Sequence, residues 1–169
     1  MVGKSKRISS TDDRGATLVE FALVIPILLL ILFGIAEVGR FLAINEAVNT
    51  ASREAARYGS VTGLSPTAAP PVPRYADCAG IREAARELAI IVNIADTDIT
   101  INYDDGTTGN IIETCPIGLQ ADPDNIGFGD RIEVTVTTNF TSGIPLIGPF
   151  LGNITVTSTD RRSIFEGSL

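Results

Sequence analysis

The feature that most constrains this chain is an apolar block near its start. Sixteen consecutive residues, from Phe21 to Ala36, carry no charge. A helix from Ala16 to Ala36 would be about 31 Å long, and the hydrocarbon core of a bilayer is about 30 Å thick. The block therefore predicts a transmembrane helix over residues 16–36, with membrane lipid around it.

The charges on the two sides of this block differ. Residues 1–15 hold four basic side chains and two acidic ones, whereas the whole chain has a formal net charge of −7. Basic residues that flank a membrane span stay on the cytoplasmic side. We therefore expect a basic cytoplasmic leader over 1–15, a single pass and an acidic extracytoplasmic portion. Its acidity argues against nucleic acid as a partner.

Helical character continues beyond the block. Residues 37–58 contain no proline and are rich in alanine, glutamate and arginine, which predicts an extracytoplasmic helix extension over 37–62. Small residues recur at every fourth position, a spacing that would let another helix approach closely. Alanine chosen only for helix propensity would give the same pattern. The small positions are Gly39, Ala43, Ala47, Ala51, Ala55 and Gly59.

A proline-rich stretch, residues 63–76, is expected to be an extended linker or loop. After it, Asp77 is placed to cap a second helix over 79–93. One side of this helix is apolar and the other is charged. The predicted apolar stripe is Ile81, Ala84, Ala85, Leu88, Ile91 and Val92, opposite Arg82, Glu83, Arg86 and Glu87.

Alternating apolar and polar residues predict strands at 99–103, 132–137 and 153–159. The expected fold class is α+β: a long N-terminal helix followed by a small exported domain over 77–169. In that domain an antiparallel sheet would pack with the second helix on one face. Between the last two strands, the apolar loop 143–152 either belongs to the core or contacts a partner or the membrane surface. Burial is favoured because a small domain needs its large apolar side chains.

Two cysteines, Cys78 and Cys115, lie beyond the apolar block. An oxidising compartment would permit a disulfide, which we favour over two unrelated buried thiols. The chain has no histidine, so the commonest general base and neutral metal ligand are missing. The acidic segments 104–105 and 122–124 lack the full ligand alternation of a calcium loop and indicate turns. We expect no enzyme activity, no metal site and no cofactor.

Glu20 lies inside the predicted span. A carboxylate at the centre of a membrane helix costs about 2.5 to 3.5 kcal/mol, and less near the end. Glu20 either reaches back to the headgroups or pairs with a cation at the same depth. Proteolysis after Gly15 would create such a cation on Ala16.

Three stretches of the sequence resemble the TadE-like family of tight-adherence pilus proteins, which are pilin-like subunits of a bacterial surface fibre. They are RGATLVEFALVIP (14–26), FGIAEVGR (33–40) and ASREAARYG (51–59), with looser similarity at 129–136 and 144–148. The resemblance implies that a prepilin peptidase cuts between Gly15 and Ala16. Glu20 would then be the fifth residue and would meet the terminal amine of a neighbouring subunit. Other pilin-like subunits and the pilus assembly machinery are the implied partners, at the bacterial cytoplasmic membrane or in a surface pilus.

The preferred interpretation is a minor pilin or pseudopilin that acts as a structural subunit. The alternative is a permanently anchored single-pass envelope protein with an extracytoplasmic binding domain, which needs no cut at Gly15. A secreted protein cleaved before Glu37 is disfavoured, because the helical pattern continues beyond Ala36.

Overall fold

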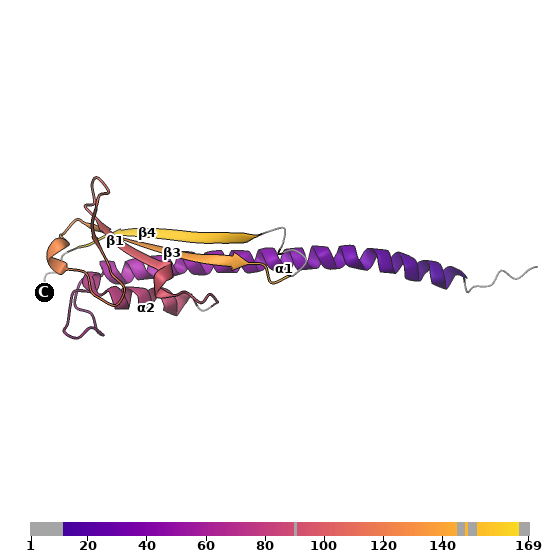
Figure 1. Cartoon of the computed structure of the whole chain (residues 1–169), viewed down its shortest axis with the longest axis horizontal. Helices are drawn as coiled ribbons and strands as arrows, with labels where there is room; N and C mark the ends of the chain where they lie inside the picture. Colours follow the sequence, from indigo (N-terminus) through magenta and orange to yellow (C-terminus); the bar gives the residue numbers. More distant parts are fainter. Residues whose placement is uncertain (1–11, 90, 145–147, 149–151, 166–169) are drawn as a thin grey trace, which may run out of the picture. The chain divides into compact units, whose positions relative to one another are not determined.

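A computed structural model gives the fold and describes residues 12–89, 91–144, 148 and 152–165. Helix α1 spans Asp12–Ser60 and continues through Pro26 (Figure 1). The chain divides into two units, one up to Gly39 and one from Arg40 onward. The expected long N-terminal helix is confirmed.

The unit from Arg40 contains a four-stranded antiparallel sheet in the order β2-β1-β3-β4. Its strands are β1 (Ile99–Asp104), β2 (Ile111–Thr114), β3 (Arg131–Thr141) and β4 (Asn153–Ser163). The three predicted strands are present, and β4 extends beyond its predicted end. Strand β2 was missed because Ile111 and Ile112 are adjacent and both exposed, so no alternation marks them.

The inward face of the sheet and the second half of α1 share one core. Along β3, Ile132, Val134 and Val136 are buried and alternate with polar residues. Val48 and several alanines of α1 belong to the same hydrophobic cluster, and Figure 1 shows the strands alongside this part of the helix. The α+β arrangement is confirmed, with helix covering one face of the sheet.

At Gly59, α1 lies against side chains of α2 and β3. A Cβ atom added there would clash with Ile132 Cδ1 and would lie 3.3 Å from Ile81 Cδ1. Small residues in this part of α1 therefore let the helix approach the sheet and α2 within the same chain.

Helix α2 spans Cys78–Leu88 and is shorter than predicted. Asp77 caps it as expected, accepting a hydrogen bond from Gly80 N at 3.0 Å. The predicted stripe is confirmed at Ile81, Ala84 and Ala85, which are buried, and is wrong at Leu88 and Ile91. Because the helix ends at Leu88, Leu88 and Ile91 are exposed, whereas Arg82, predicted on the charged side, is buried. Its guanidinium is held by main-chain carbonyls, a contact that helical periodicity does not reveal.

The proline-rich segment is a closed loop. Ser65 N donates to Val72 O at 2.8 Å and Arg74 N donates to Gly63 O at 3.1 Å. A short 3-10 turn, Arg74–Ala76, then leads to α2. Most of the apolar loop 143–152 lies outside the described residues, so the expectation of its burial is not addressed.

Candidate functional site

The first half of α1 is an uncovered apolar helix. Apart from Ile25, which is half-buried, its large apolar side chains from Leu18 to Val38 are 43–70% exposed. In the described part of the chain, α1 is the one helix long and apolar enough to cross a membrane. Such a helix needs lipid or protein around it, because water-exposed aliphatic surface costs about 25 cal/mol per Å². The N-terminal half of α1 suggests membrane anchoring.

The predicted processing residues lie in the first turns of this helix. Gly15 and Ala16 are exposed, and a Cβ atom at Gly15 would meet nothing within 4 Å. Glu20 is exposed as well and lies four residues after Ala16, on the same helix face. Among the described side chains, no arginine forms an ion pair with Glu20.

The predicted line of small residues is divided in the structure. Gly39 and Ala43 are exposed, whereas Ala47, Ala51 and Ala55 are buried in the unit that begins at Arg40. The buried members pack inside their own chain. The exposed members leave the helix backbone accessible from outside.

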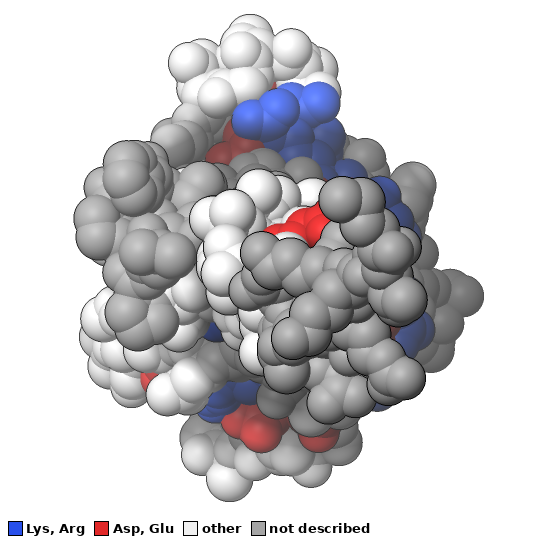
Figure 2. Space-filling view, turned by 90° about the vertical axis from the view of Figure 1, so that its right-hand side faces the viewer, with Lys and Arg blue, Asp and Glu red and all other residues white. Residues whose placement is uncertain are grey.

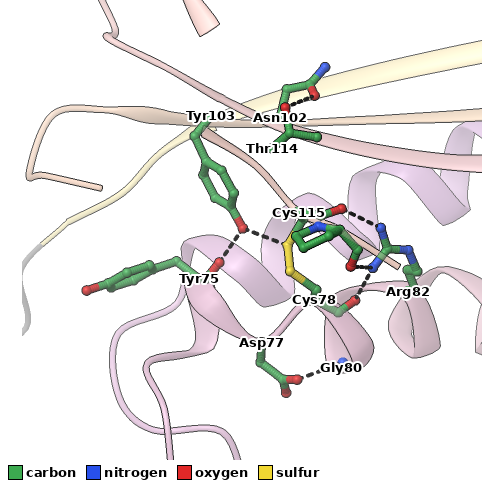
Figure 3. Close-up of a disulfide and its surroundings, with 10 residues drawn as sticks. Tyr75, Asp77, Cys78, Gly80, Arg82, Asn102, Tyr103, Thr114 and Cys115 are labelled. Atoms are coloured by element: carbon green, nitrogen blue, oxygen red, sulfur yellow. Dashed lines mark hydrogen bonds between the residues drawn. A yellow bond between two sulfur atoms is a disulfide. The ribbon is translucent and has the colours of Figure 1, made fainter. Parts of the chain in front are cut away.

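Cys78 and Cys115 form a disulfide that joins the start of α2 to the residue after β2 (Figure 3). Their Cα atoms are 5.6 Å apart and the sequence separation is 37 residues. Closing a loop of this length stabilises the fold by about 4 kcal/mol in the chain-entropy model. The Tyr103 hydroxyl lies 3.3 Å from Cys115 Sγ and donates to Tyr75 O.

Arg82 holds the same two segments without a covalent bond (Figure 3). It is 3% exposed and donates to Cys115 O at 2.7 Å and to Pro116 O and Cys78 O at 3.2 Å. These acceptors are neutral, and burial lowers the pKa of Arg82. Sequence reasoning missed this role. The sequence did contain one signal: Arg82 follows Cys78 by four residues, and this spacing places the two side chains on one face of the helix.

Asp77 connects three segments. In addition to capping α2, its carboxylate accepts hydrogen bonds from Ser65 Oγ at 2.6 Å and Tyr58 OH at 2.9 Å. Burial raises the pKa of Tyr58, so its hydroxyl stays a donor at neutral pH. The cluster ties α1 and the proline-rich loop to α2, and this is a structural arrangement with satisfied partners.

The acidic segments form turns. Asp105 accepts hydrogen bonds from the side chain of Thr108 and the backbone N–H groups of Thr107, Thr108 and Gly109. The Thr108 hydroxyl is the largest cause that lowers the pKa of Asp105, to about 2. Within the described ranges, no group of three or more acidic or cysteine side chains is arranged to hold a metal ion.

Charges on the sheet are paired across strands. Arg131 Nε lies 2.8 Å from Asp104 Oδ1, and Arg161 pairs with Glu133. On the face seen in Figure 2, acidic and basic side chains lie beside one another in small groups. Asp104 is buried, whereas the Arg161–Glu133 pair is more exposed, and exposed pairs contribute little stability, about 0 to 1 kcal/mol each.

Comparison with known proteins finds a family match for most of helix α1. No curated protein and no solved structure matches the chain. The family model described as TadE-like protein matches residues 15–57, which covers the apolar block, Glu20 and most of the helix extension. The expected resemblance to the TadE-like family is confirmed over these residues.

Proposed function

We propose that the chain is a structural subunit of the tight-adherence pilus, a minor pilin or pseudopilin inserted in the membrane by the first half of α1. The observation that carries this proposal is the uncovered apolar helix with Glu20 near its start, inside the segment that matches the family. The folded unit from Arg40 would then lie outside the cytoplasm.

Insertion is favoured by the balance of energies. Fourteen Leu, Ile, Val and Phe residues lie between Ala16 and Ala36, and at about 0.3 to 0.6 kcal/mol each they contribute about 4 to 8 kcal/mol. A carboxylate at the position of Glu20 offsets at most about 3 kcal/mol. The basic residues of the leader keep the N-terminus cytoplasmic under the positive-inside rule.

Cleavage by a prepilin peptidase between Gly15 and Ala16 would give Glu20 its partner. A terminal amine has a pKa of about 7.7 to 8.0 and is largely protonated at neutral pH. The Ala16 amine of a neighbouring pilin-like subunit would neutralise Glu20 at the same depth, in a medium where an unpaired charge is costly. The pair would act in assembly and not in folding of the outer unit.

The first test is the N-terminus of the chain. Intact mass from membranes of cells with an active prepilin peptidase should show a chain that begins at Ala16, and Gly15→Ser should leave it starting at Met1. A side chain at Gly15 meets nothing within 4 Å, so this substitution acts on processing and not on packing. Gly34→Ser is the matched control, since a Cβ atom at Gly34 also meets nothing within 4 Å. A wild-type chain that starts at Met1 contradicts processing.

The second test is the charge itself. Glu20→Gln keeps the size of the side chain and removes its charge, so the processed chain should be made and inserted but should enter fibres poorly. Sheared surface fibres are analysed for the chain by immunoblot, against its level in membranes. Normal fibre content with Glu20→Gln would refute the pairing. Together with an uncleaved N-terminus, it would favour the permanently anchored envelope protein.

A further inference from the structure

One edge of the sheet, at β2, is acidic. Residues 105–130 contain no lysine or arginine. Glu113 lies on β2, and Asn125 Nδ2 donates to its Oε2 at 2.9 Å. This bond holds the turn that contains Asp122 and Asp124, both exposed, beside the same edge. We call Glu113, Asp122 and Asp124 the acidic edge.

The opposite edge, at β4, presents guanidinium groups. In three ion pairs at this edge, the arginine side chain is more exposed than the carboxylate. The pairs are Arg161–Glu133 (59% and 19%), Arg162–Asp160 (43% and 25%) and Arg57–Glu54 (58% and 28%). The α1 pair belongs to this edge because Ser52 Oγ lies 2.9 Å from Ser158 Oγ of β4. We call Arg57, Arg161 and Arg162 the arginine edge.

The strand register places the two edges at the same height. Glu113 is opposite Tyr103, Tyr103 is opposite Ile132, and Ile132 is opposite Arg162. Glu113 and Arg162 are therefore the two ends of one row that crosses all four strands, and residues of one row share a face of the sheet. A second copy placed beside the first without stagger brings its Glu113 to Arg162.

We propose that the acidic edge of one copy docks on the arginine edge of a second copy, side by side and at the same height in the membrane. The inference rests on the proposed function, because the membrane holds both copies in the same direction. Both groups keep atoms for the contact. The bond from Arg162 to Asp160 uses Nε, at 3.0 Å, and leaves the other guanidinium N–H groups as donors. The bond from Asn125 uses Oε2 of Glu113 and leaves Oε1 as an acceptor.

The direction of α1 favours contact between opposite edges. The Phe41 ring lies 5.4 Å from the Phe140 ring, and Gly59 lies against Ile132, so this part of α1 runs antiparallel to β3 and along β4. Docking of the β2 edge on the β4 edge leaves the α1 helices of both copies pointing the same way. Two β4 edges that met antiparallel would reverse one helix. Two that met parallel and in register would place Arg162 beside the same residue of the other copy, where like charges repel.

The contact is expected to be weak in solution and effective in a membrane. Exposed ion pairs contribute little individually, but two chains anchored in one bilayer meet at a high effective concentration. Salt should weaken the contact, since the screening length falls from about 8 Å at 0.15 M to about 3 Å at 1 M. Each copy has one edge of each kind, so the contact is heterologous and extends to a third copy.

The test is cross-linking of differently tagged full-length chains in membranes. Ile111 and Ser163 are the two ends of the row next to that of Glu113 and Arg162. One copy carries Ile111→Cys, the other carries Ser163→Cys, and a short bis-maleimide joins the thiols, because both native cysteines are in the disulfide. Asn153→Cys is the matched control, an exposed position about 33 Å away along β4. We expect about tenfold fewer dimers with this control, because the linker cannot span that distance.

Charge reversal tests whether the two edges recognise each other. Arg162→Glu in the copy with Ser163→Cys, or Glu113→Arg in the copy with Ile111→Cys, should lower cross-linking about tenfold, because an attractive pair becomes repulsive. Both reversals together, each in its own copy, should restore the dimers. Recovery also excludes a folding defect, since a misfolded chain would not be rescued by a change in its partner.

The outcomes separate this proposal from the proposed function, provided that the wild-type chain is also measured in sheared fibres. Equal cross-linking at Ser163 and Asn153, or reversals without effect, overturns the docking proposal, and the proposed function stands if the chain is in fibres. Loss of dimers without recovery in the double reversal overturns the pairing of these charges. Links that form only to another pilin-like subunit overturn the choice of a second copy. Absence of the chain from fibres overturns the proposed function. Position-specific links that the double reversal restores support the docking.

Discussion

Replacement of Arg82 by methionine tests whether a buried guanidinium stabilises the unit that begins at Arg40. Methionine keeps an unbranched apolar stem and removes the charged group that donates to Cys115 O and Pro116 O. Cys78 O, the third acceptor, lies in α2, where it can also accept the helical N–H four residues later. The substitution therefore leaves two carbonyls without their donor.

Two energies oppose each other at this site. An unsatisfied buried carbonyl costs about 1 to 3 kcal/mol, so two cost about 2 to 6 kcal/mol. The substitution also removes a buried charge that has no carboxylate partner among the described residues. Because burial of such a charge is itself unfavourable, its removal offsets part of the cost of the unsatisfied carbonyls. Arg82 Nε also has no partner among the described residues, which reduces what the guanidinium contributes. We expect a net loss of about 3 kcal/mol in the free energy of unfolding.

Urea unfolding of the full chain in detergent micelles measures this loss. The chain has three tyrosines and no tryptophan. Tyr58 and Tyr103 bond to groups of the Asp77 cluster and the disulfide region, so tyrosine emission reports on this unit. At about 1 to 3 kcal/mol per molar urea, the midpoint should fall by about 1 to 3 M. Arg53→Met, an exposed change on α1, should stay within about 0.5 kcal/mol. A variant of Arg82 as stable as wild type would show that the burial cost outweighs the hydrogen bonds.

Three further predictions follow from the same unit. Cys78→Ala combined with Cys115→Ala should lower the free energy of unfolding by about 4 kcal/mol, measured by urea titration; an unchanged midpoint would show that the loop is closed by other contacts. Asp77→Ala removes the helix cap and leaves Tyr58 and Ser65 without their acceptor, so it should cost about 2 to 3 kcal/mol in thermal unfolding, and a loss below about 0.5 kcal/mol would contradict the network. The pKa of Asp105 is lowered to about 2 from an unfolded value near 3.9, so its contribution to stability is complete above about pH 4 and is lost as the pH falls through about 2. Asp105→Asn should flatten the acid limb of the stability profile, and an identical limb would refute the assignment.

The family match and the domain structure describe different parts of the chain. The match ends at Arg57, whereas the sheet, α2, the disulfide and Arg82 all follow it. The matched helix nevertheless supplies part of the core, since Val48, Ala51 and Ala55 are buried with residues of the sheet. The first half of the matched helix is thus apolar and uncovered, and its second half is a packing surface for the core.

The residues proposed for processing and assembly were selected from the sequence. Gly15, Ala16 and Glu20 were selected by an apolar block interrupted by one acid and by the motif around it. The structure adds that all three are exposed and that a side chain at Gly15 would meet no neighbour. It also separates the small residues of α1 by their exposure. Gly39 and Ala43 are exposed, whereas Ala51 and Ala55 are buried in the chain's own core.

What the sequence alone determined was local: a long helix, three alternating strands, the Asp77 cap and the α+β class. Periodicity reports these features because the geometry of the backbone sets which side chains share a face. Only the tertiary structure decided that Arg82 is buried, that Ile91 is exposed and that β2 pairs with β1. These outcomes depend on groups far away in the chain, such as the carbonyls after β2 that need a donor, and local spacing contains no information about them.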